Sequence, residues 1–208
     1  MQVKQADPQC TYNRRDIILG FSLAGILNLV RVNHTYAHQG KNSKGGKKVL
    51  EVVVRVFNEK GVLGEPVKQP KVVKTLEEWK KILTKEQFYV TRNSGTERPF
   101  CGTLLDNKKE GVYTCVCCKL PLFSSNAKFN SGTGWPSFFQ PICRENVSTK
   151  PDHSHGMIRV EINCTRCDAH LGHVFEDGPR PTGLRFCLNS ESLEFTEQKD
   201  LPKLAEGK

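Results

Sequence analysis

The sequence has no apolar run of the roughly 20 residues that a helix needs to cross a membrane. The nearest approach, residues 17–30, is interrupted by Gly20, Ser22, Gly25 and Asn28. The sequence also has no internal repeat beyond two short cysteine motifs. With 37% hydrophobic and 25% charged residues, the composition is that of a globular chain and excludes a disordered or fibrous one. The length of 208 residues suits one domain with an extension, or two small domains.

Acidic residues are scarce relative to basic ones. The chain has 22 Asp and Glu against 31 Lys and Arg, which gives a formal net charge of +9. Such an excess is compatible with nucleic-acid or membrane-surface contact. The lysines, however, are scattered among Val, Glu and Gly rather than interleaved with aromatics on one stripe. We therefore expect a solvated, lysine-rich surface and no nucleic-acid partner.

Residues 1–37 have the layout of an export signal. Arg14 and Arg15 precede the apolar run, and Arg31 and then the small residues of Thr35-Tyr36-Ala37 follow it. Paired arginines and moderate hydrophobicity favour the twin-arginine type, which leads to the periplasm or the thylakoid lumen. The alternative is an amphipathic or buried helix at the edge of the domain, in a protein that stays in the cytoplasm.

The remaining chain divides by composition. Residues 38–48 are rich in Gly and Lys and read as a linker. Val49–Phe57 is β-branched and predicts a strand, and residues 62–71, with two prolines, predict an extended segment. We therefore predict a linker and N-terminal extension over 38–71, a main folded domain over 72–200 and a C-terminal tail over 201–208.

Two short helices are expected at the start of that domain. Thr75 with Glu78 forms a capping box, and apolar residues at helical spacing follow it. Thr84 is expected to cap a second helix that runs to Phe88 and Tyr89. After Thr96 the sequence consists of short β-type pieces separated by Gly, Pro, Asn and Asp.

Cysteine is abundant, with nine residues, and four of them form two C-x-x-C motifs. Cys115 and Cys118 form the first, Cys164 and Cys167 the second. Two residues between cysteines let both thiolates face one ion, and two such turns supply a tetrahedral Zn²⁺ site. Such a site has no open coordination position and stabilises the fold. Free core cysteines are the alternative; a redox C-x-x-C lacks the thioredoxin-like βαβ pattern around it.

A second cysteine motif indicates thiol chemistry. Cys187 lies in an alternating segment with Arg185 and Asn189 on its face of the expected strand, and a nearby arginine lowers the pKa of a thiol. His170 and His173 are candidate general acids. Taken singly, each of these residues has a plain structural role as the alternative, such as a small buried cysteine or histidines that are hydrogen-bonded and do not touch a substrate.

Trp135 lies in a Gly- and Pro-rich loop that can present its indole to a small apolar group. By itself a tryptophan beside a proline is usually part of a core. The residues alone therefore predict thiol chemistry beside a structural zinc site.

From Ser94 to Phe195 the sequence resembles methionine sulfoxide reductase B. The matching strings keep the family's order and spacing, and the lead-in at 78–89 matches too. They are Gly95-Thr-Glu-Arg-Pro-Phe100, Gly111-Val-Tyr-Thr-Cys115, Ser131-Gly-Thr-Gly-Trp-Pro-Ser-Phe138, Ser154-His-Gly156, Cys167-Asp-Ala-His-Leu-Gly-His-Val-Phe-Glu-Asp-Gly-Pro179, Pro181-Thr-Gly183 and Arg185-Phe-Cys-Leu-Asn-Ser190. The resemblance implies a mainly β fold with two antiparallel sheets, zinc at one end and short N-terminal helices.

The resemblance also implies an activity, the reduction of the R epimer of methionine sulfoxide in proteins. Cys187 would attack the sulfoxide sulfur while a histidine, His170 or His173, helps to protonate the oxygen. Cys187 then becomes a sulfenic acid, a second thiol condenses with it, and thioredoxin reduces the disulfide. Trp135 and Phe175 would bind the substrate in an enzyme that we expect to be a monomer.

One position departs from the family pattern. Many members have a cysteine, which resolves the sulfenic acid, where this chain has Thr133. Cys101 is the substitute that the resemblance favours, Cys143 and Cys117 are alternatives, and a mechanism without a resolving cysteine stays open. The competing class is a non-catalytic zinc-knuckle β module that binds a peptide or protein. That class explains the zinc cysteines but not Cys187 with its neighbours.

Overall fold

The computed structural model describes residues 49–205. The segment expected to be an export signal, the first part of the linker and residues 206–208 lie outside this range. Within it, none of the helices combines the length and hydrophobicity that crossing a membrane requires.

Two short helices open the domain, as the sequence predicts. In α2 (Leu76–Ile82), the Thr75 hydroxyl accepts from the Glu78 amide, and the Glu78 carboxylate accepts from the Thr75 amide. Thr84 and Gln87 form the same reciprocal box at the start of α3 (Lys85–Asn93). This helix runs four residues beyond the expected end at Tyr89, because its left-handed cap is Ser94, with φ 52°.

The largest sheet has six antiparallel strands. It runs in the order β5 (Lys128–Phe129), β6 (Ser137–Phe138), β10 (Arg185–Leu188), β9 (His170–Phe175), β8 (Arg159–Cys164) and β7 (Val147–Asp152). In β10, Phe186 and Leu188 are buried while Cys187 between them is half-buried on the other face. The alternation predicted for this strand is therefore present.

A second sheet of three antiparallel strands has the order β11 (Leu193–Glu197), β3 (Gly111–Cys115) and β4 (Pro121–Ser124). Aromatic rings join the two sheets. The ring centroid of Phe138 lies 4.9 Å from Tyr113 and 4.8 Å from Phe123, which in turn lies 5.7 Å from Phe186. Such contacts bury large apolar surfaces and fix the sheets against each other. The prediction of a mainly β fold with two antiparallel sheets is confirmed.

Short 3₁₀ segments connect the strands. They are η3 (Ser125–Ala127), η4 (Arg144–Asn146), η5 (Ser154–Gly156), η6 (Ser190–Ser192) and η7 (Gln198–Ala205). In η7, Leu201 and Ala205 are buried, and Leu201 packs with Phe57 and Val112. The start of the segment expected to be a tail is thus part of the packed body.

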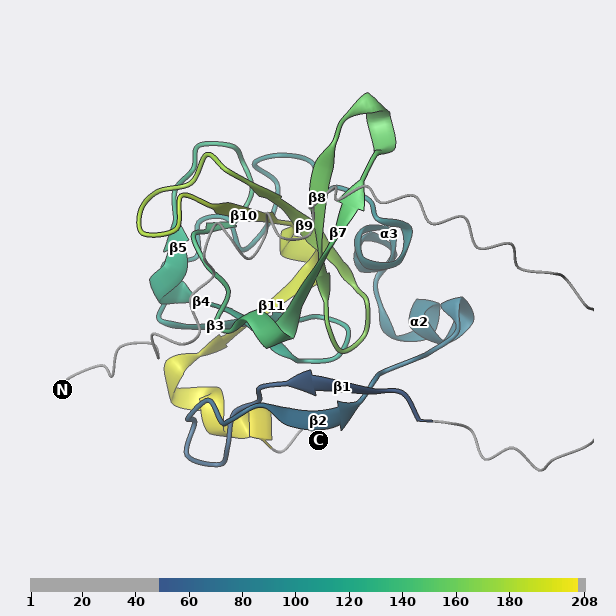
Figure 1. The fold of residues 1–208 in the computed structure, drawn as a ribbon, viewed down its shortest axis with the longest axis vertical. Helices are drawn as coiled ribbons and strands as arrows, with labels where there is room; N and C mark the ends of the chain where they lie inside the picture. Colours follow the sequence, from purple (N-terminus) through teal and green to yellow (C-terminus); the bar gives the residue numbers. More distant parts are fainter. Residues whose placement is uncertain (1–48, 206–208) are drawn as a thin grey trace, which may run out of the picture.

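The N-terminal extension forms a separate hairpin, β1 (Glu51–Val54) and β2 (Val67–Pro70), which lies below the main body beside η7 in Figure 1. Val54 is completely buried in the main core. The buried Asn146 side chain binds both the amide and the carbonyl of Arg55, each at 2.7 Å, as a neighbouring strand would. The strand predicted within Val49–Phe57 is present. The Asn146 side chain connects the hairpin to the main body.

Candidate active site and metal centre

The four cysteines of the two C-x-x-C motifs meet in one cluster. Their Sγ atoms all lie within 4.8 Å of one another, with 3.6 Å between Cys115 and Cys167 and 3.5 Å between Cys118 and Cys164. A tetrahedral site with Zn–S bonds near 2.3 Å has sulfurs about 3.8 Å apart. The cluster therefore fits a metal ion of that size, and four sulfurs leave no coordination position for a substrate.

Two tight turns and the Arg92 side chain lie next to this cluster. Lys119 and Asp168 each follow a motif with positive φ, 61° and 56°, and donate their amides to the carbonyls of Cys115 and Cys164. Arg92 of α3 donates to the carbonyl oxygen of Cys167 at 2.7 Å and to its sulfur at 3.5 Å. A cation beside the sulfurs offsets part of the negative charge that four thiolates carry.

The candidate nucleophile lies elsewhere in the fold, on β10. Cys187 is half-buried at a small cavity of about 110 Å³. The strands β8, β9 and β10 and two loops supply its walls, which are Thr96, Trp135, Arg159, Gly172, His173, Phe175, Cys187, Leu188 and Asn189. Five of the predicted site residues therefore meet at one cavity, large enough for a small side-chain group.

Opposing effects act on the Cys187 thiol. Burial is the larger effect and raises its pKa above the usual value, while the Arg185 guanidinium and the Thr133 hydroxyl act to lower it. Arg185 is held in place by two hydrogen bonds of 2.9 Å to the Asp177 carboxylate, and its guanidinium lies 4.4 Å from the centre of the Phe175 ring. The structure thus supplies a fixed positive charge that favours the thiolate.

The two histidines occupy different positions. His173 lines the cavity, and its Nε2 lies 2.8 Å from Asp152 Oδ2. His170 is only 2% exposed and lies behind it, with 5.4 Å between the ring centroids. His170 Nδ1 is 2.8 Å from Glu161 Oε1, and its Nε2 is buried without a hydrogen-bond partner. Of the two, His173 is the one able to touch a molecule in the cavity.

Glu97 ties the loop of Trp135 to the end of β10. Its carbonyl accepts from the indole Nε1 at 3.1 Å, and its amide donates to Asn189 Oδ1 at 3.0 Å. Its carboxylate accepts from the amides of Ser190 and Glu191. Asn189 also donates to the carbonyl of Leu171, so its amide fixes backbone around the cavity.

The three remaining candidate thiols are far from equivalent. Cys143 is completely buried, and Cys117 contacts the cluster cysteines Cys115 and Cys167. Cys101 is exposed and follows Phe100, whose amide donates to the carbonyl of Gly134 at 2.8 Å. Among these three thiols, Cys101 is the one on a segment packed against the loop that contacts Cys187.

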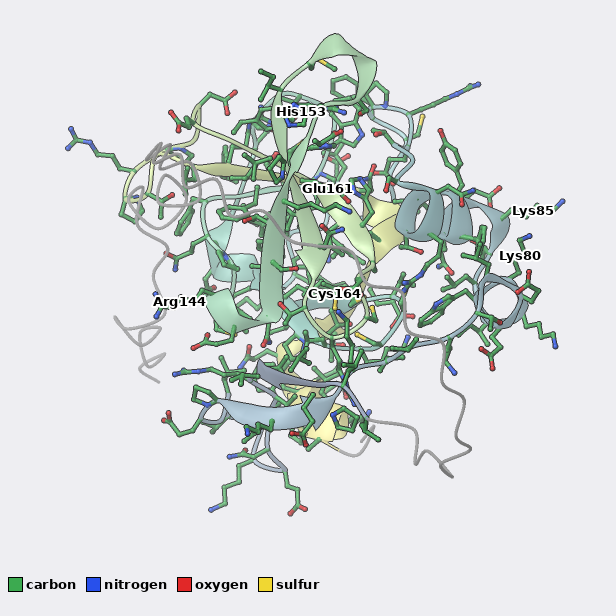
Figure 2. The ribbon with its side chains drawn as sticks, turned by 45° about the vertical axis from the view of Figure 1, so that its right-hand side comes forward. Lys80, Lys85, Arg144, His153, Glu161 and Cys164 are labelled. Atoms are coloured by element: carbon green, nitrogen blue, oxygen red, sulfur yellow. The ribbon has the colours of Figure 1, made fainter. Side chains whose placement is uncertain are left out.

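Sequence reasoning missed the acidic residues of the site. Asp177 binds Arg185, and Glu97 binds Trp135 through its carbonyl. Glu161 contacts His170 and Asp152 contacts His173. Arg159, which lines the cavity, was also missed. Asp177 is eight positions from Arg185 and falls inside a recognised string, which is a usable signal. Figure 2 shows Glu161 midway along β8, between Cys164 at one end and the turn that carries His153 beyond the other. No local pattern distinguishes that glutamate from a surface residue.

Comparison with known proteins identifies relatives of this chain. The SelR domain family matches residues 83–197. The peptide methionine sulfoxide reductase MsrB of Methanosarcina mazei is 55% identical over 135 residues, which are 65% of this chain and 96% of the relative. The proteins of the same name from Herminiimonas arsenicoxydans and Pseudomonas putida are 56% and 58% identical over 131 and 125 residues, which cover 63% and 60% of this chain and 96% and 94% of the relatives.

A half-buried thiol at a cavity, apart from a closed cysteine cluster, and the reductases named above place the protein among the oxidoreductases. Within that class the chain belongs to the MsrB family of SelR-domain enzymes. The resemblance seen in the sequence is thereby confirmed.

Proposed function

We propose that this enzyme reduces the R epimer of methionine sulfoxide in oxidised proteins back to methionine, with Cys187 as the nucleophile. The observation that carries the proposal is the single cavity at which Cys187, His173, Trp135 and Phe175 meet. The relatives named above are peptide methionine sulfoxide reductases, which supports the choice of substrate. The aromatic walls suit the methyl group of the substrate, and His173 suits the sulfoxide oxygen.

The reaction balances as a two-electron exchange. The Cys187 thiolate attacks the sulfoxide sulfur, His173 protonates the oxygen, and the oxygen is transferred to Cys187. Methionine leaves as the reduced product and Cys187 remains as a sulfenic acid. Arg185 promotes the first step because its positive charge favours the thiolate over the thiol.

Cys101 is the thiol that we propose for the next step. It would attack the sulfenic acid, form a disulfide with Cys187 and release water; thioredoxin or a similar dithiol would then reduce that disulfide. Two contacts support this choice. The Thr133 hydroxyl lies near enough to act on the pKa of the Cys187 thiol, and the carbonyl of the next residue, Gly134, accepts from the amide of Phe100, which precedes Cys101.

The four-cysteine cluster would hold one structural Zn²⁺ bound by Cys115, Cys118, Cys164 and Cys167. Such an ion contributes to folding and supplies no chemistry to the reaction.

We further propose that the protein acts as a monomer in protein repair under oxidative stress. Residues 1–37 would direct it across a membrane by the twin-arginine route.

The competing proposal is a binding module without turnover, and one assay separates the two. Dabsylated methionine R-sulfoxide is incubated with the protein and dithiothreitol, and the methionine product is quantified. We expect turnover by the wild type and none by Cys187→Ser, whose circular dichroism and zinc content should match the wild type. Cys101→Ser is the matched control and should keep its dithiothreitol-supported activity. Turnover by folded Cys187→Ser, or by neither protein, would contradict the proposal.

A further inference from the structure

One carboxylate oxygen contacts a histidine and an arginine that both line the cavity. Asp152 ends β7 and pairs in register with Arg159, the first residue of β8. Its Oδ2 lies 2.8 Å from His173 Nε2 and 2.7 Å from Arg159 Nη2. The side chains of all three residues are largely buried, between 11% and 20% exposed. A shared and sheltered acceptor of this kind fixes the position of both partners.

The contact determines which histidine nitrogen carries hydrogen. A carboxylate can only accept, so Nε2 of His173 is the donor, in the neutral ring as well as in the imidazolium. Nδ1 is then the nitrogen that gains and loses a proton as His173 titrates. His170 has the opposite arrangement, since its Nδ1 faces Glu161. The two rings therefore use different nitrogens to contact their carboxylates: His170 uses Nδ1 and His173 uses Nε2.

Asp152 is also a permanent negative charge. Hydrogen bonds from the backbone and side chain of Ser154, and then from His173, hold the pKa of Asp152 well below its usual range, and the charge of Arg159 acts in the same direction. Burial is the largest effect on His173 and lowers its pKa below the usual value, while the hydrogen bond and charge of Asp152 act in the opposite direction.

The other ionisable groups around His173 do not replace this carboxylate. Arg159 on β8 and His170 on β9 both lower the pKa of His173. Glu161 is opposite His173 in the β8–β9 register. Its carboxylate contacts His170, Asn163 and Lys150 instead. Cys187 on β10 is the reacting thiol. Asp152 is thus the carboxylate whose contact favours the charged form of His173.

We infer that Asp152 is a positioning residue for the reductase step: it holds His173 with Nε2–H toward its own carboxylate and stabilises the imidazolium, so that Nδ1 delivers the proton to the sulfoxide oxygen. The inference rests on the proposed function and adds the atom that gives the proton. When the proton leaves, His173 becomes a neutral ring that still donates from Nε2. Arg159 shares the carboxylate and limits how strongly it favours the imidazolium.

The first test needs no variant and no turnover. Nitrogen NMR of the imidazoles in the wild type reports the tautomer of each neutral ring. We expect His173 to carry its hydrogen on Nε2. A ring with hydrogen on Nδ1 would overturn the inference, whatever the enzymatic activity of the protein.

The second test compares Asp152→Asn with Asp200→Asn, a matched change at a partly exposed carboxylate that pairs with nearby Lys203. Methionine release is measured in a single turnover between pH 5 and pH 10. In Asp152→Asn the imidazolium loses its counter-charge, so the decline of the rate at high pH should begin at lower pH. At neutral pH the rate should fall by roughly 10–100-fold, within the whole contribution of a general acid of about 10²–10⁴-fold.

The shape of the pH profile separates positioning from mere structural support. An equal loss at every pH, or a profile like that of the wild type, would overturn the inference. Absence of methionine release from the wild type would instead contradict the proposed function, and the tautomer measurement then decides the inference alone.

Discussion

Cys187 and His173 are directly opposite each other on the neighbouring antiparallel strands β10 and β9. Two residues along each strand, Arg185 is opposite Phe175 in the same register. Side chains alternate between the faces of a strand, so all four point to one face, where the cavity lies. A shift of the register by one residue would remove the thiol from both its arginine and its histidine.

Arg185 should set the pH at which the nucleophile becomes reactive. Because its charge lowers the pKa of Cys187 against the effect of burial, Arg185→Met should raise that pKa. The rate of alkylation by iodoacetamide should then rise at higher pH than in the wild type. Arg180→Met, at an exposed arginine, is the control. Coincident profiles for Arg185→Met and the wild type would show that the arginine has another role.

Cys101→Ser should separate chemistry from recycling. The variant should release one methionine per chain and keep dithiothreitol-supported activity, because Cys187 is intact. It should lose thioredoxin-supported turnover, and oxidised wild type should yield a peptide that links Cys101 to Cys187 by mass spectrometry. Normal turnover of the variant with thioredoxin would mean that another thiol, or thioredoxin itself, attacks the sulfenic acid.

Cys164→Ser should cost the protein its metal and much of its stability. The substitution removes one of four sulfurs, and structural zinc contributes directly to folding. We expect close to one zinc per chain in the wild type and much less in the variant, with a lower thermal midpoint. Cys101→Ser should leave both unchanged. A stable, zinc-free Cys164→Ser protein with normal activity would contradict the assignment.

Asn146→Ala should loosen the β1–β2 hairpin without touching the cavity. The side chain makes three hydrogen bonds of 2.7 Å, to the amide and carbonyl of Arg55 and to the carbonyl of Pro121. Their loss leaves buried backbone groups unpaired, so the free energy of unfolding should fall by about 2–4 kcal/mol. Denaturant unfolding measures this, with the exposed Asn126→Ala as control. An unchanged midpoint would mean that the hairpin is held by other contacts.

The N-terminal segment can be tested apart from the enzyme. A fusion of residues 1–45 to a folded reporter should cross a membrane that has a twin-arginine translocase. Arg14→Lys together with Arg15→Lys should block that passage, because the paired arginines are the feature that the route reads. A reporter that stays in the cytoplasm with either sequence would leave the segment as an ordinary arm.

Local features could be read from the sequence because their physics is local. Thr75 and Thr84 cap helices through residues three positions away, and each C-x-x-C motif turns within four residues. The alternation around Cys187 already separates its face from that of Phe186. The end of α3 was missed because a left-handed Ser94 gives little signal in the sequence.

What the sequence by itself determined is therefore the family, the reactive thiol as a candidate and the metal-binding motifs. Tertiary structure alone decided that His173 and not His170 reaches the cavity, and that Asp152 and Glu97 hold the residues around it. Those contacts join segments 21 and 38 residues apart. Their existence depends on strand register and on packing between loops, which neither the propensity of a residue nor the spacing of a motif encodes.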